Sequence, residues 1–251
     1  MNVKSRIRCV ESIVEEISYL VEKFNAKDFF FTDDLFFTNI NSLRKFERIM
    51  KDKNLDINYN AQLRVNMITD EVCTLLKSSG CKKIEVGVES GSQKILNEVC
   101  KGISIESIKR GISIAKRNDL RIKTNWIYGL PGGIEEQYKS IDLMLETRPD
   151  EISIHQLIPF PGTEYYNNRQ KYGINIKNPT NFESFCYGDL DDNISYSYMS
   201  RLQYEKLMYD TIVALEGIGY ISSDDQINKS KYIYTTPFDK KSLKTIEKEA
   251  I

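Results

Sequence analysis

The segment IEVGVESGS, residues 84–92, decides the interpretation of the fold. It opens with a short apolar run, which is typical of a strand buried in a parallel sheet. It ends in the polar residues Glu89, Ser90 and Ser92. In a chain that alternates strands and helices, ligands bind at the ends of the strands. Residues 84–92 therefore predict a strand together with one side of a ligand site.

Four further strands are predicted around this segment, and apolar residues at helical spacing lie between them. The five predicted strands cover residues 26–32, 57–63, 83–88, 121–128 and 151–158. This alternation predicts a parallel sheet with right-handed crossovers. Such a sheet is built either as an open doubly wound sheet or as a partial (β/α) barrel.

Several helix boundaries are also predicted. Ser12 and Glu15 form an expected capping box. Thr69 is an expected N-cap, and Gly80 ends the helix that Thr69 begins. Beyond residue 163 the periodicity changes: residues 164–199 show little pattern, a helix is expected near 200–215, and the tail from residue 222 is polar.

Composition narrows the class of protein. The 251 residues carry a formal net charge of −1 and no basic run, which gives no support for binding to nucleic acid or to a membrane surface. No apolar stretch approaches the about 20 residues of a membrane span. The first residues lack an apolar signal core, so a cytoplasmic location is expected.

The cysteines predict no metal centre of their own. They stand at positions 9, 73, 81, 100 and 186 without C-x-x-C spacing, and the chain has one histidine. A structural zinc site needs about four nitrogen or sulfur ligands close together. Reduced and mostly buried thiols are therefore expected.

Other predicted strand ends also carry polar residues. Asp33 and Asp34 follow FFFT, residues 29–32, and Arg64 ends NAQLR, residues 60–64. A carboxylate there accepts hydrogen bonds from an ammonium group, and a guanidinium group binds a carboxylate with two hydrogen bonds. The alternatives are a helix N-cap for the aspartates and a structural ion pair for Arg64.

Two glycine- and proline-rich segments end the last two strands: NWIYGLPG, residues 125–132, and LIPFPGT, residues 157–163. Taken alone, GLPGG is only a turn signal. His155 stands two residues before the second segment. A single histidine is more often a core residue than a catalyst, but this position near a strand end makes His155 the candidate for proton transfer.

In this order, over residues 10–166, the strand-end segments resemble those of the radical S-adenosylmethionine (SAM) superfamily, especially its cobalamin-linked branch. Residues 33–36, DDLF, match the DD-x-F sequence of that branch, and residues 87–92, GVESGS, are similar to its GIESGS. Residues 127–133, IYGLPGG, resemble IGLPGET except at the acidic position, and residues 157–163 resemble LxPxPGT.

The resemblance implies a partial TIM-like (β/α) barrel over residues 1–166, with five to six parallel strands and outer helices. Residues 167–251 would form a helical and irregular C-terminal extension that caps the barrel. It also implies a SAM site in which aspartates bind the amino group, Arg64 the carboxylate, and Glu89 with Ser90 the ribose. The whole implied set is Asp33, Asp34, Arg64, Glu89, Ser90, Ile127, Gly129, Pro131 and Pro159.

One family feature is missing from the sequence. Radical SAM enzymes hold a [4Fe-4S] cluster with cysteines spaced C-x3-C-x2-C, and no such triplet occurs here; Cys9 alone is no substitute. We therefore expect no metal ligands in this chain and no radical chemistry from it in isolation. The expected explanations are an excised piece of a longer enzyme, one half of a split enzyme with an N-terminal partner segment, or a degenerate ligand-binding homologue. Cobalamin would enter only through a missing N-terminal domain.

Two other classes of protein compete with this interpretation. A metal-independent barrel lyase or aldolase needs a lysine at a strand end for a Schiff base, but Lys123 falls early in its strand. A non-catalytic scaffold would use the tyrosine-rich residues 164–209 as a binding face. The family resemblance instead implies radical-type hydrogen abstraction or methyl transfer on a small-molecule substrate.

Overall fold

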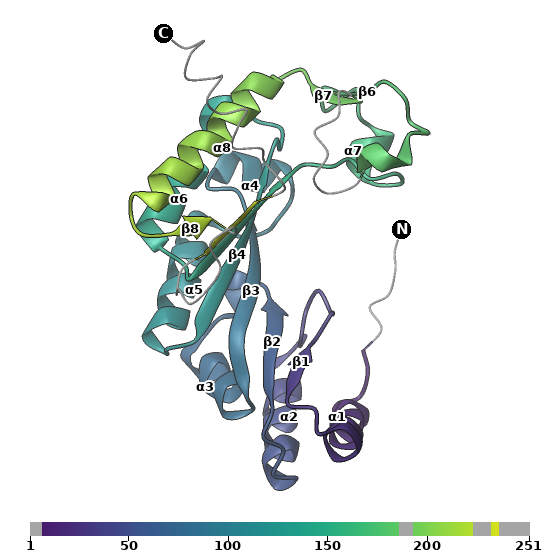
Figure 1. The fold of residues 1–251 in the computed structure, drawn as a ribbon, viewed down its shortest axis with the longest axis vertical. Coiled ribbons are helices and arrows are strands. Elements are labelled where there is room, and N and C mark those ends of the chain that lie inside the picture. The colour runs from purple at the N-terminus through teal and green to yellow at the C-terminus, as the bar shows by residue number, and fades with distance from the viewer. Residues whose placement is uncertain (1–6, 186–192, 223–231, 236–251) are drawn as a thin grey trace. The chain divides into compact units, whose positions relative to one another are not determined.

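The computed structural model of the protein describes residues 7–185, 193–222 and 232–235 (Figure 1). The chain divides into two compact units: Met1–Val86 with Arg110–Ile122, and Gly87–Lys109 with Lys123–Ile251. Strands β3 (Cys81–Glu89) and β4 (Arg121–Tyr128) each contribute to both units. The strand order of the main sheet is β1-β2-β3-β4-β5-β9-β8.

The first unit is built on parallel strands. The pairing of β1 with β2 aligns Phe29 with Tyr59, and the pairing of β2 with β3 aligns Leu63 with Val86. Helices join consecutive strands, so the expected strand–helix alternation is confirmed. Besides part of β3, the unit contains α1 (Val10–Phe24), β1 (Asp28–Phe30), α2 (Ile40–Asp52), β2 (Asn58–Leu63), the 3-10 helix η1 (Val65–Met67), α3 (Asp70–Ser78) and most of α5 (Ile105–Arg117).

The ends of α3 follow from its sequence. The side chain of Thr69 accepts a hydrogen bond from the N–H of Val72 at 3.2 Å, which confirms the predicted N-cap. Gly80 has a φ of +102°, and a Cβ there would lie 2.1 Å from the carbonyl oxygen of Ile57. Only glycine meets both conditions, so Gly80 ends the helical segment as predicted.

The predicted capping box of the first helix is wrong. Helix α1 begins at Val10, and its N-cap, Cys9, makes no side-chain hydrogen bond. The hydroxyl of Ser12 instead accepts from the guanidinium of Arg8 at 3.2 Å. Helical backbone extends upstream of Ser12, so Ser12 lies inside the first turn.

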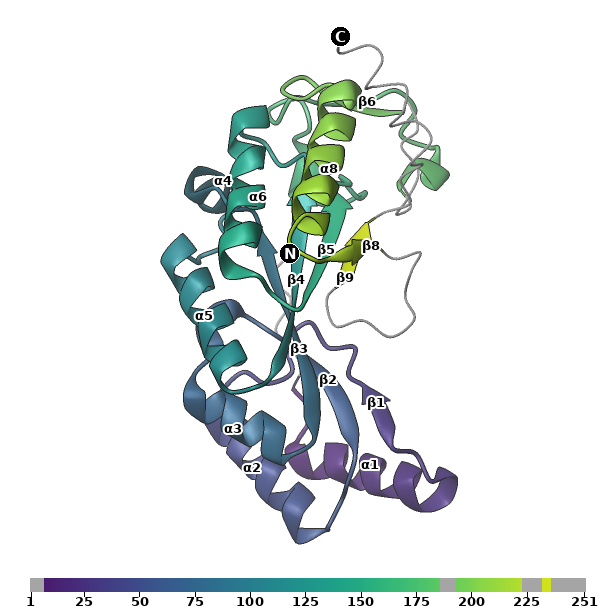
Figure 2. The same cartoon turned by 60° about the vertical axis from the view of Figure 1, so that its left-hand side comes forward.

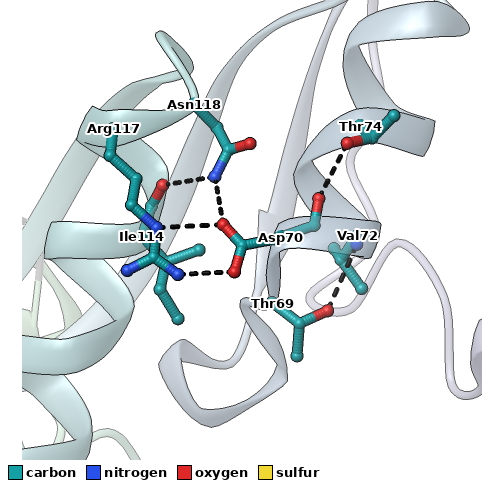
Figure 3. Close-up of polar contacts among 7 residues, drawn as sticks. All are labelled: Thr69, Asp70, Val72, Thr74, Ile114, Arg117 and Asn118. Atoms are coloured by element: carbon teal, nitrogen blue, oxygen red, sulfur yellow. Dashed lines mark hydrogen bonds and ion pairs between the residues drawn. The ribbon is translucent and has the colours of Figure 1, made fainter.

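An exposed polar cluster joins α3 to α5 within the first unit (Figure 3). Arg117 Nε donates to Asp70 Oδ1 at 3.0 Å, and Asn118 Nδ2 donates to the same oxygen at 2.7 Å. Asp70 also stands in the first turn of α3, where negative charge is favourable. The hydrogen bonds from Arg117 and Asn118 lower the pKa of Asp70 below its ordinary value.

The second unit continues the sheet with further parallel pairs. Strand β4 pairs with β5, and β5 pairs with β9. Helices α6 and α8 lie side by side (Figure 2), and the hydroxyl of Tyr138 on α6 donates to Asp210 on α8 at 2.6 Å. Besides the end of β3 and most of β4, the elements are α4 (Gln93–Glu98), the first residues of α5, α6 (Ile134–Thr147), β5 (Glu151–Gln156), α7 (Glu164–Asn167), β6 (Ile174–Ile176), η2 (Phe182–Phe185), β7 (Ile194–Tyr196), α8 (Arg201–Glu216), β8 (Ile221–Ser222) and β9 (Tyr232–Thr235).

Two parts of the second unit differ from the sequence-based expectation. Residues 174–176 and 194–196 form an antiparallel pair, β6–β7, where little pattern was evident. Strand β8 ends at the first residue of the polar tail, β9 lies within that tail, and both strands join the main sheet. The rest of that tail lies outside the described residues. Within the described residues, no helix is long and apolar enough to span a membrane.

Candidate functional site

The first unit carries Asp33, Asp34 and Arg64 at the carboxyl ends of two neighbouring parallel strands. The two aspartates are exposed in the loop after β1, and Arg64 is the exposed residue directly after β2. The N–H of Phe36 donates to the carbonyl of Gln62 at 2.9 Å, which fixes this loop against the end of β2. Within this unit, all three predicted ligand-binding side chains therefore lie at one end of the sheet.

An aromatic cluster in the same unit supports the loop. Phe36 packs against Phe31 with ring centroids 4.7 Å apart and against Tyr59 at 5.3 Å. Phe46 of α2 lies 5.4 Å from Phe36. Because these side chains come from the loop, from β2 and from α2, their packing holds the backbone that carries Asp33 and Asp34.

Glu89 lies at the end of β3 in a strained backbone conformation. Its φ of 70° falls in the left-handed region, which non-glycine residues seldom adopt. Such a conformation costs about 1–3 kcal/mol and is concentrated at ligand sites. The side chain is 18% exposed, and its Oε1 accepts a hydrogen bond from Lys101 Nζ at 2.6 Å. Glu89 is therefore the predicted site residue with the most distinctive geometry.

The turn after Glu89 is fixed by its own hydroxyls. Ser90 is fully buried, and its Oγ accepts from the N–H of Ser92 at 3.1 Å. The N–H of Gly91 donates to Ser140 Oγ on α6 at 2.9 Å. Ser92 caps α4 and also donates to a carboxylate oxygen of Glu136. Ser90 thus shapes the backbone of the turn, and this contact was not foreseen from the sequence.

The loop after β4 offers its backbone rather than its side chains. Gly129 has a φ of +89°, Pro131 is buried, and the carbonyl of Leu130 accepts from Gln137 Nε2 at 2.6 Å. Ile127 is half-buried on β4 and packs against an apolar cluster that includes Leu130. A backbone role for residues 127–131 is consistent with this arrangement.

Two tyrosines, which sequence analysis did not single out, hold the strand-end loops. The hydroxyl of Tyr198 donates to the carbonyl of Gly129 at 2.7 Å, and that of Tyr196 donates to the carbonyl of Leu157. Pro159 is buried two residues beyond Leu157. The only signal for these contacts was the abundance of tyrosine in residues 164–209.

His155 lies on β5 beside β4, with its Cα paired to that of Ile127. Its Nε2 and the buried hydroxyl of Ser153 are 2.9 Å apart. Burial lowers the pKa of His155 from its ordinary value; the charge of Lys123 acts in the same direction, and Glu89 partly opposes them. The lowered pKa favours the neutral imidazole at neutral pH, and only the neutral form of the ring can accept a proton.

Two cysteines of the first unit, Cys73 and Cys81, are buried, whereas Cys9 is exposed. Burial raises the pKa of Cys73 to about 11 and that of Cys81 to about 12, so both side chains favour the thiol over the thiolate that binds metals. Across the described ranges, no group of three His, Cys, Asp or Glu side chains is arranged to hold a metal ion.

The radical SAM superfamily model matches residues 1–145. This chain belongs to the radical SAM superfamily. It is 29% identical over 158 residues to an uncharacterized methyltransferase of Pyrococcus horikoshii, covering 62% of this chain and 34% of that protein. It is 26% identical over 217 residues to the bacteriochlorophyllide d C-12(1)-methyltransferase of Chlorobaculum tepidum, covering 82% and 44%.

The fold is that of a solved radical SAM methyltransferase. The structure of TsrM from Kitasatospora setae, with cobalamin and a [4Fe-4S] cluster bound, matches with a TM-score of 0.64 at 17% identity. The match covers 95% of this chain and 51% of TsrM. The expected partial TIM-like barrel of parallel strands is thereby confirmed. The chain spans only about a third to a half of the length of these relatives.

Family membership implies SAM and a [4Fe-4S] cluster as cofactors of complete family members. The space over Gly87, where a Cβ would lie, is occupied by the side chains of Glu89 and Lys101. Residues 1–251 contain no C-x3-C-x2-C triplet, and the described cysteines offer no cluster site.

Proposed function

We propose that this chain is the SAM-binding part of a radical SAM enzyme. The observation that carries the proposal is Glu89, a carboxylate residue with a strained backbone at the end of β3 in the GVESGS segment. A carboxylate accepts hydrogen bonds from both hydroxyls of a ribose, and a strained backbone at a strand end is characteristic of a ligand site. The family match over residues 1–145 supports SAM as the ligand.

The remaining contacts to SAM are proposed from the hydrogen-bonding chemistry of the residues at the strand ends. Asp33 and Asp34 accept from the amino group of the methionine part, and Arg64 donates to its carboxylate. The backbone of the β4–α6 loop binds the adenine edge, with Tyr198 and Gln137 holding that backbone. The proposed cofactor residues are Asp33, Asp34, Arg64, Glu89, Ser90, Ile127, Gly129, Pro131 and Pro159.

The proposed reaction of the complete enzyme is methyl transfer. Both curated relatives described above are named methyltransferases, as is TsrM. Cobalamin is bound in the TsrM structure, and in our proposal it would be carried by another domain of the complete enzyme. In this scheme the neutral His155 is the side chain proposed to move a proton beside the substrate.

The cluster ligands are proposed to come from a segment or chain other than residues 1–251. The strand edge of the first unit supports such a partner. Strand β1 is the last strand of the sheet order on its side, and the side chain of Phe30 is 59% exposed. Open, apolar strand edges pair readily with a further strand.

The second candidate function, a ligand-binding module without radical chemistry, is favoured by the missing cysteine triplet.

Binding of S-adenosylhomocysteine, the unreactive analogue of SAM, tests the proposal. Calorimetry and ligand-observed NMR should detect weak binding to the chain, reduced by Glu89→Ala and by Asp34→Ala. The control is Glu15→Ala, because Glu15 is an exposed carboxylate on α1. Equal binding by all four proteins would assign these carboxylates a structural role and overturn the site.

A further inference from the structure

Helix α6 carries two polar side chains on its buried face. Gln137 and Ser140 are each 1% exposed, and they stand one helical turn apart beside the apolar residues Ile141 and Met144. Buried polar groups are normally hydrogen-bonded, because a group that is removed from water and left without a partner destabilises the fold. Each polar atom of these two side chains is therefore expected to have a partner.

Half of the Gln137 carboxamide has no partner in the described part of the chain. Its Nε2 donates to the backbone carbonyl of Leu130 at 2.6 Å. Its Oε1 is buried and accepts no hydrogen bond from any residue that the structure describes. Turning the amide over would place Oε1 against the carbonyl oxygen of Leu130, so that two acceptors would meet. The acceptor of Gln137 therefore requires a donor that the described residues do not supply.

Two buried serines at the turn after β3 have the opposite requirement. Ser140 Oγ accepts from the N–H of Gly91 at 2.9 Å, and Ser90 Oγ accepts from the N–H of Ser92 at 3.1 Å. Among the described residues, neither hydroxyl donates a hydrogen bond in return. Ser90 directly precedes Gly91 in the chain, so both hydroxyls lie where this turn meets the buried face of α6 that carries Gln137.

One molecule that both donates and accepts can satisfy all three groups. Gln137 Oε1 needs a donor, whereas the hydroxyls of Ser90 and Ser140 need acceptors. A buried water typically makes about three hydrogen bonds to polar groups that lack protein partners. An ammonium ion only donates, and a metal ion binds oxygen lone pairs, so either would leave the hydroxyl hydrogens without an acceptor.

We propose that Gln137, Ser90 and Ser140 bind one structural water molecule between α6 and the turn after β3. The water joins that turn, which follows Glu89, to the helix whose Gln137 holds the carbonyl of Leu130 in the loop after β4. It therefore fixes two strand-end turns of the second unit relative to each other. The inference rests on the hydrogen bonds of the protein and does not depend on which ligand the strand ends bind.

A high-resolution crystal structure of the full 251-residue chain tests the proposal directly. The expected result is one ordered water within hydrogen-bond distance of Gln137 Oε1 and of at least one of the two serine hydroxyls. Three findings would overturn the proposal: no water beside Oε1, a protein donor on Oε1, or a metal ion with its shorter contacts to oxygen.

A double-mutant cycle, followed by denaturant unfolding, tests the water in solution. Gln137 and Ser90 share no direct hydrogen bond, so Gln137→Met and Ser90→Ala should together lose less stability than the sum of their separate losses. Gln137→Met with Ser79→Ala is the control cycle and should be additive, because Ser79 is a buried serine of the first unit that contacts Tyr59 at 2.7 Å. Additive losses in both cycles would overturn the shared water. If Gln137→Met does not fold, Ser90→Ala with Ser140→Ala replaces it.

Discussion

The hydroxyl of Tyr198 donates to the backbone carbonyl of Gly129 at 2.7 Å. This contact joins the turn after β7 to the loop after β4, although the two residues are far apart in the sequence. Gly129 is buried, so its carbonyl would otherwise lack a partner in a site shielded from water. The C-terminal extension therefore helps to fix the loop proposed to bind adenine.

Replacing Tyr198 with phenylalanine should reduce the free energy of unfolding by about 1–2 kcal/mol, because the ring is kept and one buried hydrogen bond is lost. Denaturant unfolding measures this loss. Tyr172→Phe is the control, because the Tyr172 hydroxyl donates to Glu164 on the surface at 3.1 Å. A loss for Tyr198→Phe no larger than that for the control would show that the Gly129 contact adds no stability.

A second and larger loss of stability is expected when Gly91 is replaced. A Cβ on Gly91 would lie 2.2 Å from the carbonyl oxygen of Lys139, and that oxygen belongs to backbone. Gly91→Ala should therefore displace the turn from α6 and cost about 1–3 kcal/mol, as other overpacked sites do. Gly217→Ala is the control, since its nearest atoms are 3.3 Å away and its backbone is right-handed. Equal melting temperatures for both variants would contradict the predicted clash.

The contribution of the Asp70–Arg117 ion pair to stability should depend on pH (Figure 3). The folded protein lowers the pKa of Asp70 below its ordinary 3.8, so this contribution to stability is present above that value. It is lost as the pH falls through the lowered pKa. Arg117→Met should therefore lower the melting temperature slightly at pH 7, and the difference should vanish in strong acid.

The effect should be small, because both side chains are exposed and screened by water. Arg110→Met is the control, because Arg110 is an exposed arginine of the same helix. A difference between Arg117→Met and the unmodified protein that persists unchanged at low pH would assign it to packing rather than to the ion pair.

Local sequence signals predicted much of the fold. Strand β4 covers the predicted residues 121–128, and Thr69 and Gly80 bound α3 as expected. Strand β9 was not predicted, because its four residues stand in a polar tail and pair with β5 about 80 residues earlier in the sequence. A short strand carries little periodicity, and its stability depends on a distant partner.

The candidate site was predicted only in part for the same reason. Strand-end motifs indicated Glu89 and the glycines, because those residue types have local conformational meaning. The partner of Glu89, Lys101, depends on two left-handed residues in a loop, and no local pattern reports their effect. The hydroxyls of Tyr196 and Tyr198 reach backbone carbonyls, which have no sequence signature at all.

His155 provides the last prediction, and its titration is simple to follow because the chain contains one histidine. Burial and the charge of Lys123 lower its pKa below the ordinary 6.5, while Glu89 acts in the opposite direction. The imidazole resonance should therefore titrate with a midpoint below 6.5 in an NMR pH series. Lys123→Met should raise that midpoint, and Glu89→Gln should lower it further.

The lowered pKa of His155 also predicts how the stability of the protein depends on pH. Below pH 6.5 the unfolded chain binds a proton at His155 more readily than the folded protein does, so stability falls as the pH drops through and below this value. Above pH 6.5 the neutral imidazole contributes no such dependence. His155→Gln should remove this component of the melting-temperature profile. A midpoint at or above 6.5 in the unmodified protein would contradict the lowered pKa that burial imposes on His155.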